Sequence, residues 1–200
     1  SPIRDRHGEI VGIAQIARDI TMLKEREREV LRMYRLYSAL SQISHTTVRA
    51  QTRDELFQNA CRVLVEQGAI GMAWIGWRDP GTEQLVPAAV WGNDVDHIRN
   101  IRIYADERPE GLGPSGQAYR SGQPYICNRL LMDPAMSLWR AELGKRGYRA
   151  LAVFPIRENG RIAGTLTVYA DREDFFQAKE VALLEEAAGN VSFALDNFLR

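Results

Sequence analysis

The chain has 200 residues, 45% of them hydrophobic, which is enough for one domain of ordinary size with a real hydrophobic core. Its 26 basic and 26 acidic side chains cancel, so no bulk charge draws it to nucleic acid or an anionic membrane. The longest apolar runs are strand-length, and no secretory signal is present, so we expect no membrane span. The two cysteines, Cys61 and Cys127, form no C-x-x-C pair, which favours a reduced, cytoplasmic protein without a zinc knuckle.

The first residues predict a β-hairpin with strands at 3–7 and 10–17 and a turn at His7–Gly8. A two-stranded hairpin is not stable alone in water, so the rest of its sheet is expected elsewhere. The chain also starts without Met. We therefore expect it to be a piece of a longer protein.

A long helix is predicted over 21–46, a stretch without Gly or Pro that Asp19 or Thr21 can cap. It carries two apolar stripes: Leu23, Val30, Tyr34 and Tyr37 on one side, and Met33, Leu36, Leu40 and Ile43 on the other. Two stripes indicate two partners, a domain core and another helix. A single wide buried face is the alternative.

A second amphipathic helix is predicted over 52–67. Thr52 can cap it, Glu55 can complete a capping box, and Gly68 follows its end. Cys61 falls among apolar residues of this helix, which predicts a buried core thiol.

From residue 69 the hydrophobic period changes to that of strands. Six strands are predicted: 69–77, 85–92, 98–104, 123–128, 149–157 and 160–170. The Asp-Pro-Gly at 79–81 and the Glu-Asn-Gly at 158–160 are typical of hairpin turns. Between the fourth and fifth strands lies a long stretch, 129–148, that is expected to be irregular and partly helical.

Asp174 is expected to open a last helix, from about 176 to the end of the chain. Its apolar residues repeat every 3.5 residues, which is typical of a coiled-coil seam. The seam residues are Val181, Leu184, Ala188, Val191, Leu195 and Phe198. The order of elements predicts an α+β domain with one antiparallel sheet and its terminal helices on one face.

The glycines Gly111, Gly113 and Gly116 form a G-x-G-x-x-G pattern, which in dinucleotide-binding proteins cradles phosphates. Such a loop needs a buried parallel strand before it and a full crossover helix after it. Here a polar stretch broken by proline precedes the pattern, and only the six residues 117–122, which end at Gly122, separate it from the next strand. We therefore predict a short helix that starts at Pro114, with Gly113 as its cap.

Three strings along the chain carry a family resemblance. "PEGLGPSGQAYRSGQPYICN", "DPAMSLWRAELGKRGYRALAVFPI" and "GRIAGTLTVYA…FFQAKEVALLEEAAGNVSFAL" resemble successive passages of GAF domains over roughly 35–200. "GEIVGIAQIARDITMLKERE" resembles the last strand and exit motif of a PAS domain. The resemblance divides the chain into a PAS tail at 1–18, a signalling helix at 19–45 and a GAF domain at 46–200.

A GAF-type six-stranded antiparallel sheet implies terminal helices on one face and a loop-covered pocket on the other. The resemblance places the helix 114–121 and the loop 129–148 around this pocket. Candidate lining residues are Trp91, Tyr119, Cys127, Asp133, Trp139, Arg140 and Tyr148. Aromatic faces and one guanidinium would suit a planar or anionic ligand. Alternatively, both tryptophans are core and Arg140 pairs with a local acid such as Glu142 or Asp133.

Several departures from the family limit the cofactors that we expect. Little of the N-K…F-x-x-x-D-E set of cyclic-nucleotide GAF domains is present around Asn128-Arg129, Phe176 and Glu180. Cys127 lacks the following His of covalent bilin sites, and His97 is a lone candidate for a haem ligand. Similar GAF domains often carry Asn-Asp where this chain has Asn128-Arg129, which changes the charge at the pocket rim. We expect no bilin, haem or metal, and the ligand stays unassigned.

The resemblance implies a regulatory module of a bacterial signalling protein. It would control an attached diguanylate cyclase, cyclic-di-GMP phosphodiesterase or histidine kinase, and no catalytic residue is assigned to the chain itself. A parallel homodimer is expected through 23–37 and 181–198. Two alternatives stay open: dimerisation without a ligand, and reduction of methionine sulfoxide, for which Cys127 and Cys61 would have to act together.

Overall fold

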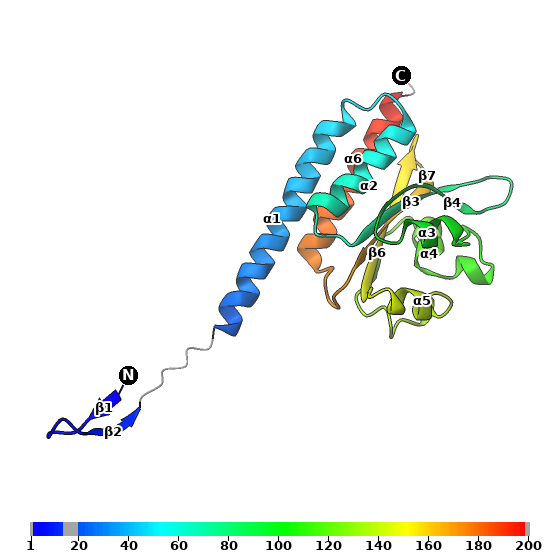
Figure 1. The fold of residues 1–200 in the computed structure, drawn as a ribbon. Helices are drawn as coiled ribbons and strands as arrows, with labels where there is room; N and C mark the ends of the chain where they lie inside the picture. Colours follow the sequence, from blue (N-terminus) through cyan, green and yellow to red (C-terminus); the bar gives the residue numbers. More distant parts are fainter. Residues whose placement is uncertain (1, 14–19, 199–200) are drawn as a thin grey trace. The chain divides into compact units, whose positions relative to one another are not determined.

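The computed structural model describes residues 2–13 and 20–198 (Figure 1). The described residues up to Leu31 form one unit, and those from Arg32 onward form a second, larger one. Each is treated by itself below.

In the first unit, β1 (Pro2–Arg4) and β2 (Ile10–Ile13) pair as an antiparallel hairpin, as the sequence predicts. Gly8 in the turn has a φ of 84°, which glycine adopts without strain. Residues 14–17 of the predicted second strand, and the candidate cap Asp19, lie outside the described residues. Helix α1 (Thr21–Thr47) then begins, and its residues up to Leu31 are all exposed.

The second unit is built on a five-stranded antiparallel sheet with the order β4-β3-β7-β6-β5. Its strands are β3 (Met72–Arg78), β4 (Leu85–Gly92), β5 (Tyr125–Cys127), β6 (Ala150–Glu158) and β7 (Arg161–Ala170). Asn159 and Gly160 join β6 to β7 with φ values of 52° and 74°. Two positive values are what a tight Asn-Gly hairpin turn requires, so this part of the prediction is confirmed.

The strand predicted at 98–104 is not formed. Helix α3 (Val95–Asn100) occupies its first half, and only a single bridge joins Tyr104 to Gln84. Ile98 and Ile101 lie three residues apart, a helical spacing, and both are buried. The Ile103 carbonyl accepts from the Leu85 N–H at 2.9 Å, so this segment lies against the edge of β4 without forming a strand.

Helices α2 (Arg53–Gln67) and α6 (Ala178–Phe198) cover one face of the sheet, and α1 from Arg32 onward packs along these two helices (Figure 1). The Thr52 hydroxyl accepts from the Glu55 N–H at 3.2 Å, and Gly68 ends the helix, so the predicted limits of α2 are confirmed. Alternate side chains of the strands point into this layer. They include Ala73 and Ile75 of β3, Phe154 and Ile156 of β6, and Leu166 and Val168 of β7.

The apolar seam predicted on α6 packs inside the protomer. Leu184, Ala188, Val191 and Leu195 are each at most 2% exposed and belong to the core between helices and sheet. The seam is thus the face of α6 that covers its own sheet, and these four side chains are not a dimer interface. The helix also begins two residues later than predicted, at Ala178, because Asp174 has a φ of 54° and cannot open it.

Helices α1 and α6 run side by side and parallel. Near the start of α6, Arg32 contacts Glu180, and further along both helices the Asn190 side-chain amide donates to the Ser44 hydroxyl at 2.9 Å. Both contacts advance in the same sense along the chain, which fixes the parallel arrangement that Figure 1 shows.

The opposite face of the sheet carries short elements and loops. These are α3, η1 (Pro109–Gly111), α4 (Pro114–Ser121), η2 (Pro134–Met136) and α5 (Arg140–Lys145). They enclose a second buried cluster, which includes Trp74, Ile98, Met136 and Tyr169. No helix in the described part of the chain is both long and apolar enough to cross a bilayer.

Candidate functional site

The G-x-G-x-x-G pattern packs backbone against backbone. A Cβ on Gly111 would overlap the Asp106 carbonyl, and a Cβ on Gly116 would overlap the Gly111 carbonyl oxygen and lie 2.7 Å from its carbon. Arg120 donates to the carbonyls of both Asp106 and Gly111, at 2.7 and 2.9 Å. The glycines therefore form a tight entrance to α4, with Pro114 at its first position and Gly113 before it, as predicted.

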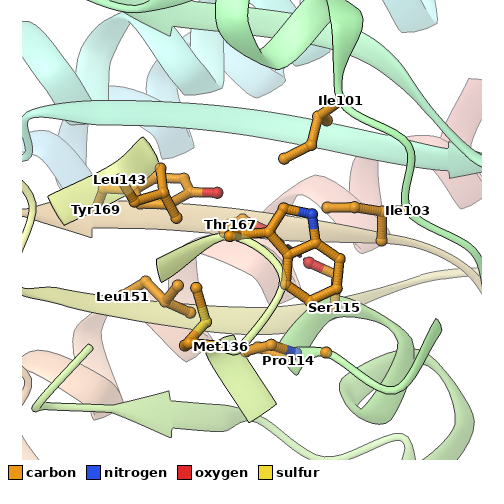
Figure 2. Close-up of a pocket in the computed structure, with 11 residues that line it drawn as sticks. Ile101, Ile103, Pro114, Ser115, Met136, Leu143, Leu151, Thr167 and Tyr169 are labelled. Atoms are coloured by element: carbon orange, nitrogen blue, oxygen red, sulfur yellow. Dashed lines mark hydrogen bonds between the residues drawn. The ribbon is translucent and has the colours of Figure 1, made fainter. Parts of the chain in front are cut away.

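A small cavity lies between α4, the loop 129–148 and the sheet (Figure 2). Its wall contains Ile101, Ile103, Gly113, Pro114, Ser115, Met136, Trp139, Leu143, Leu151, Thr167 and Tyr169. The free volume is about 20 Å³, room for about one water molecule. This is the position that the family resemblance implies for a pocket, but the pocket is nearly filled.

The polar groups in the cavity wall are hydroxyls. Ser115 Oγ and Thr167 Oγ1 lie 3.3 Å apart and share a hydrogen bond, which Figure 2 marks with a dashed line. Tyr169 accepts from Trp74 Nε1 at 3.2 Å, and burial raises the pKa of its phenol to about 12. Among the described residues of the wall none is charged, so the cavity favours neutral chemistry.

Of the seven predicted lining residues, Trp139 alone is in this wall. Trp91 lines a shallow groove beside Gln58 and Val65 of α2, away from the cavity. Tyr119 donates its hydroxyl to the Ile162 carbonyl at 3.0 Å. Both side chains therefore contribute to packing and surface rather than to the cavity.

Asp133 makes several hydrogen bonds near the start of the loop 129–148, which we call the pocket loop. Its carboxylate accepts from the Tyr125 hydroxyl at 3.0 Å and from the Ala135 N–H at 2.9 Å. Arg140 donates Nη2 to the Asp133 backbone carbonyl at 2.8 Å, so it pairs with the local main chain instead of facing a ligand. The cation expected for an anionic ligand is therefore not in the cavity wall.

Tyr148 closes the other end of the same loop. Its hydroxyl donates to Asp94 Oδ2 at 2.7 Å, and Arg146 donates to Asp94 Oδ1 at 2.6 Å. Burial alone would raise the pKa of Asp94, but these two hydrogen bonds outweigh it and hold the pKa below its usual value. Close by, burial and the charge of Arg146 lower the pKa of His97, whose buried Nε2 has no hydrogen-bond partner among the described residues.

The two thiols lie on opposite faces of the sheet. Cys61, a residue of α2, belongs to the core between the helices and the sheet, and Cys127 belongs to the cluster on the cavity side. Burial, followed by the neighbouring Asp133, raises the pKa of Cys127 to about 12, and burial raises the pKa of Cys61 further. Within residues 2–13 and 20–198, no group of three His, Cys, Asp or Glu side chains is placed to hold a metal ion.

Asn128 connects the cavity side to the start of α6. Its side-chain amide donates to the Phe176 carbonyl and accepts from the Phe176 N–H, both at 2.9 Å. Its backbone carbonyl accepts from the Asp174 N–H at 3.0 Å. Asn128 follows β5 and immediately precedes the pocket loop, so it joins that loop directly to the segment before α6.

A partly buried ion pair then connects α6 to α1. Arg32 Nε donates to Glu180 Oε1 at 2.8 Å, and the Glu180 side chain is only 2% exposed. Glu180 Oε2 also accepts from the Gln177 N–H, and the Arg32 guanidinium lies 5.3 Å from the centre of the Phe175 ring. A continuous set of contacts thus runs from Asn128 to Phe176, through the adjoining Gln177 to Glu180, and on to Arg32. We call these five residues the helix relay.

Sequence reasoning missed the helix relay and most of the cavity wall. One signal was present: in the strand "GTLTVYA", Thr165, Thr167 and Tyr169 alternate with apolar residues. Alternation puts all three on one face, and Thr167 and Tyr169 do line the cavity. The isoleucines and leucines of the wall carry no comparable signal.

A family model described as a GAF domain matches residues 50–196. The chain belongs to the GAF domain family. The match spans the sheet, the glycine entrance, the cavity and nearly all of α6, so the resemblance stated from the sequence is confirmed. The expectation of a preceding PAS tail stays a prediction.

Several known proteins resemble this GAF domain. The methanogenesis regulatory histidine kinase FilI of Methanothrix harundinacea is 27% identical over 198 residues. The alignment covers 96% of this chain and 22% of the kinase, so the chain spans about a fifth of that relative.

Solved structures of other GAF proteins share its fold. The GAF domain of a phosphoenolpyruvate-protein phosphotransferase from Coxiella burnetii has a TM-score of 0.69 at 19% identity, covering 82% of this chain and 95% of that one. A free methionine-R-sulfoxide reductase from Neisseria meningitidis, in complex with its substrate, has a TM-score of 0.68 at 19% identity, covering 92% and 95%. At these identities the likeness concerns the fold.

Proposed function

We propose that this GAF domain is a sensory or regulatory module of a multidomain signalling protein. A small molecule bound between α4 and the pocket loop would change the arrangement of α1 and α6, and these helices would act on an attached output domain such as a histidine kinase. The histidine kinase relative supports this assignment of role.

The helix relay is the observation that carries the proposal. A ligand can shift an equilibrium only through contacts that differ between two arrangements. The Asn128–Phe176 hydrogen bonds and the Arg32–Glu180 pair supply a route of direct contacts from the pocket loop to both helices.

Native mass spectrometry of freshly purified protein, followed by a denatured run, tests the ligand directly. We expect a small molecule that is present in the native spectrum and released on denaturation. A protein with no bound mass, and with no thermal stabilisation by a library of small metabolites, would instead support dimerisation alone as the function.

A catalytic role as a methionine sulfoxide reductase is the second candidate, because reductases are among the structural neighbours. Thiol chemistry of this kind needs a thiolate with a second thiol nearby. Cys127 has a raised pKa, and Cys61 lies across the sheet. We therefore propose a non-catalytic module. Turnover of free methionine sulfoxide, with oxidation of Cys127 detected by mass spectrometry, would overturn this.

A homodimer remains part of the proposal, through a different surface from the α6 seam. On α1, Tyr34 and Tyr37 are 70% and 65% exposed, and on α6, Phe193 is 68% exposed. Leu23 and Val30, which the sequence places in the same stripe of α1, are also exposed. We propose that Tyr34, Tyr37 and Phe193, named here the aromatic face, meet a second copy.

A further inference from the structure

Trp139 takes up the space that a ligand of the cavity would need. Its Cη2 lies 2.6 Å from the position that a Cβ on Gly113 would occupy, so the indole ring rests directly against the Gly113 backbone. The volume left over is about 20 Å³. Because that volume holds about one water molecule, a larger ligand enters only if a side chain of the wall moves, and the Trp139 ring is the largest of these side chains.

Packing alone holds the indole in place. Its N–H makes no hydrogen bond to any residue that the structure describes, although the backbone of Trp139 bonds to Met136 and Leu143 at 3.0 Å. Trp74 differs, because it is fully buried and its Nε1 donates to Tyr169. Rotating the Trp139 side chain out of the cavity therefore breaks contacts but no hydrogen bond.

If the Trp139 ring moved out, the cavity wall around it would be mostly apolar, with the hydroxyls of Ser115 and Thr167 at one side. Ile103, Met136 and Leu151 offer apolar surface, and Figure 2 shows them around the same space. The hydroxyls of Ser115 and Thr167 can each donate or accept a hydrogen bond. A buried charge would find no counter-ion in this wall, so the geometry selects against ions.

We propose that Trp139 is a built-in substitute for the ligand, and that the ligand is a neutral, planar aromatic molecule of about the size of indole. The ligand displaces the Trp139 ring and takes its place against Gly113. This inference rests on the proposed ligand-binding function. It also specifies how binding would act, because Trp139 immediately precedes α5 and its displacement rearranges the pocket loop that follows Asn128.

Indole is the probe for the test, with Trp139→Gly as the variant. Removing the ring leaves a cavity of the matching shape, so Trp139→Gly should bind indole in calorimetry and gain thermal stability from it. Its affinity should exceed that of the wild type by at least about tenfold, because the wild type must first expel its own ring. Trp91→Gly, at a surface tryptophan, should bind no better than the wild type. A folded Trp139→Gly protein that binds no indole would overturn the proposal.

A second measurement uses the wild type, in case Trp139→Gly does not fold. With 5-fluorotryptophan incorporated and Trp139→Phe used for assignment, the fluorine resonance of Trp139 should move toward its solvent-exposed position as indole is added. The resonance of Trp74 should stay close to its original position. An unchanged Trp139 resonance at saturating indole would contradict displacement.

A third experiment compares a neutral ligand with a charged one. Indole-3-acetate, which carries a carboxylate, should bind Trp139→Gly at least about tenfold more weakly than indole does. Equal affinity would refute the neutral class. If indole fails but native mass spectrometry finds another bound molecule, the inference falls and the sensory function stands. If no molecule binds at all, both fall.

Discussion

Individual glycines show why a familiar pattern has an unfamiliar role here. Phosphate-binding loops use glycine so that the backbone can approach a ligand. In this chain Gly111 and Gly116 let the backbone approach itself, and Gly113 makes room for the ring of Trp139. The same pattern thus supports the entrance to a helix, and the ring occupies the place of a ligand.

We predict that Gly116→Ala destabilises the protein by about 3 kcal/mol, because the new methyl group would overlap the Gly111 carbonyl. Chemical denaturation followed by circular dichroism measures the free energy of unfolding. Gly189→Ala on α6 is the control, since a Cβ there meets no atom within 4 Å. It should stabilise the helix by about 0.5–1 kcal/mol. Equal effects of the two variants would refute the close-packing argument.

His97 should make stability depend on pH. Burial and Arg146 lower its folded pKa below the unfolded value of 6.5, with Asp94 and Glu142 opposing them. The unfolded state therefore binds the proton more readily, and stability falls as pH drops below 6.5 toward the folded pKa.

His97→Asn should make the free energy of unfolding depend less on pH. Denaturation at a series of pH values from neutrality to below 6.5 measures this. His45→Asn, at an exposed position on α1, should leave the curve unchanged. A wild-type curve that rises on acidification through this window would be inconsistent with a lowered pKa.

Among the secondary-structure elements, the order of helices and hairpins could be predicted because its signals are local. Thr52 with Glu55 marks a helix start, and Asn159-Gly160 marks a hairpin turn. The segment 98–104 was assigned the wrong structure because three isoleucines in seven residues fit a strand by composition. Their spacing and the capping at Asn100, which bonds to the Asp96 carbonyl, favour a short helix instead.

The site could be predicted only as a region. The family resemblance placed α4 and the loop 129–148 around the cavity, as the structure does. The conspicuous polar side chains, however, bond to local groups outside the cavity wall: Arg140 donates to the Asp133 backbone carbonyl, and the Asp133 carboxylate accepts from Tyr125. The aliphatic residues of the cavity wall, such as Ile103 and Leu151, come from segments far apart in the chain, and only tertiary packing brings them together. Trp139 is the one wall residue that was predicted, because it is a large aromatic residue within the loop 129–148 itself.

We expect Asn128 to connect the pocket loop to the start of α6. We predict that Asn128→Ala costs about 2 kcal/mol of stability, since two hydrogen bonds to Phe176 are lost. Hydrogen exchange at the start of α6 and in α1 after Arg32 should accelerate more than exchange in β3, which should change only by the loss of global stability. Asn93→Ala, at an exposed turn, is the matched control. Normal exchange in both helices of a folded Asn128→Ala protein would argue against the helix relay.

At the scale of the whole molecule, the two faces of the helical layer have different partners. The inner side chains belong to the core with the sheet, and Tyr34, Tyr37 and Phe193 of the aromatic face are exposed in the described part of the chain. Aromatic side chains dominate interface energetics because they bury much area at little entropic cost. The exposed stripe of α1 that contains Tyr34 and Tyr37 is therefore available for contact with a second copy, whereas the seam of α6 is buried in the core of its own protomer.

We predict a homodimer in sedimentation experiments, and a shift toward monomer of at least about tenfold in the dissociation constant for Tyr37→Glu or Phe193→Glu. Each glutamate would place a charge in a desolvated contact. Glu185→Gln, which changes an exposed residue of α6, should leave the dissociation constant unaltered. A wild-type protein that stays monomeric at high concentration would contradict the proposed interface.

The parallel course of α1 and α6 has a consequence for how such a domain fits into a longer chain. The polypeptide enters the second unit along α1 and leaves it along α6 in the same direction, at the opposite end of the same helical layer. Two further domains joined through these helices would therefore attach at opposite ends of the layer. Each inserted helical residue changes the angular phase between them by about 100°, and about seven residues restore it. A domain of this geometry can be added, removed or duplicated without reversing the chain, provided that the linker keeps that phase.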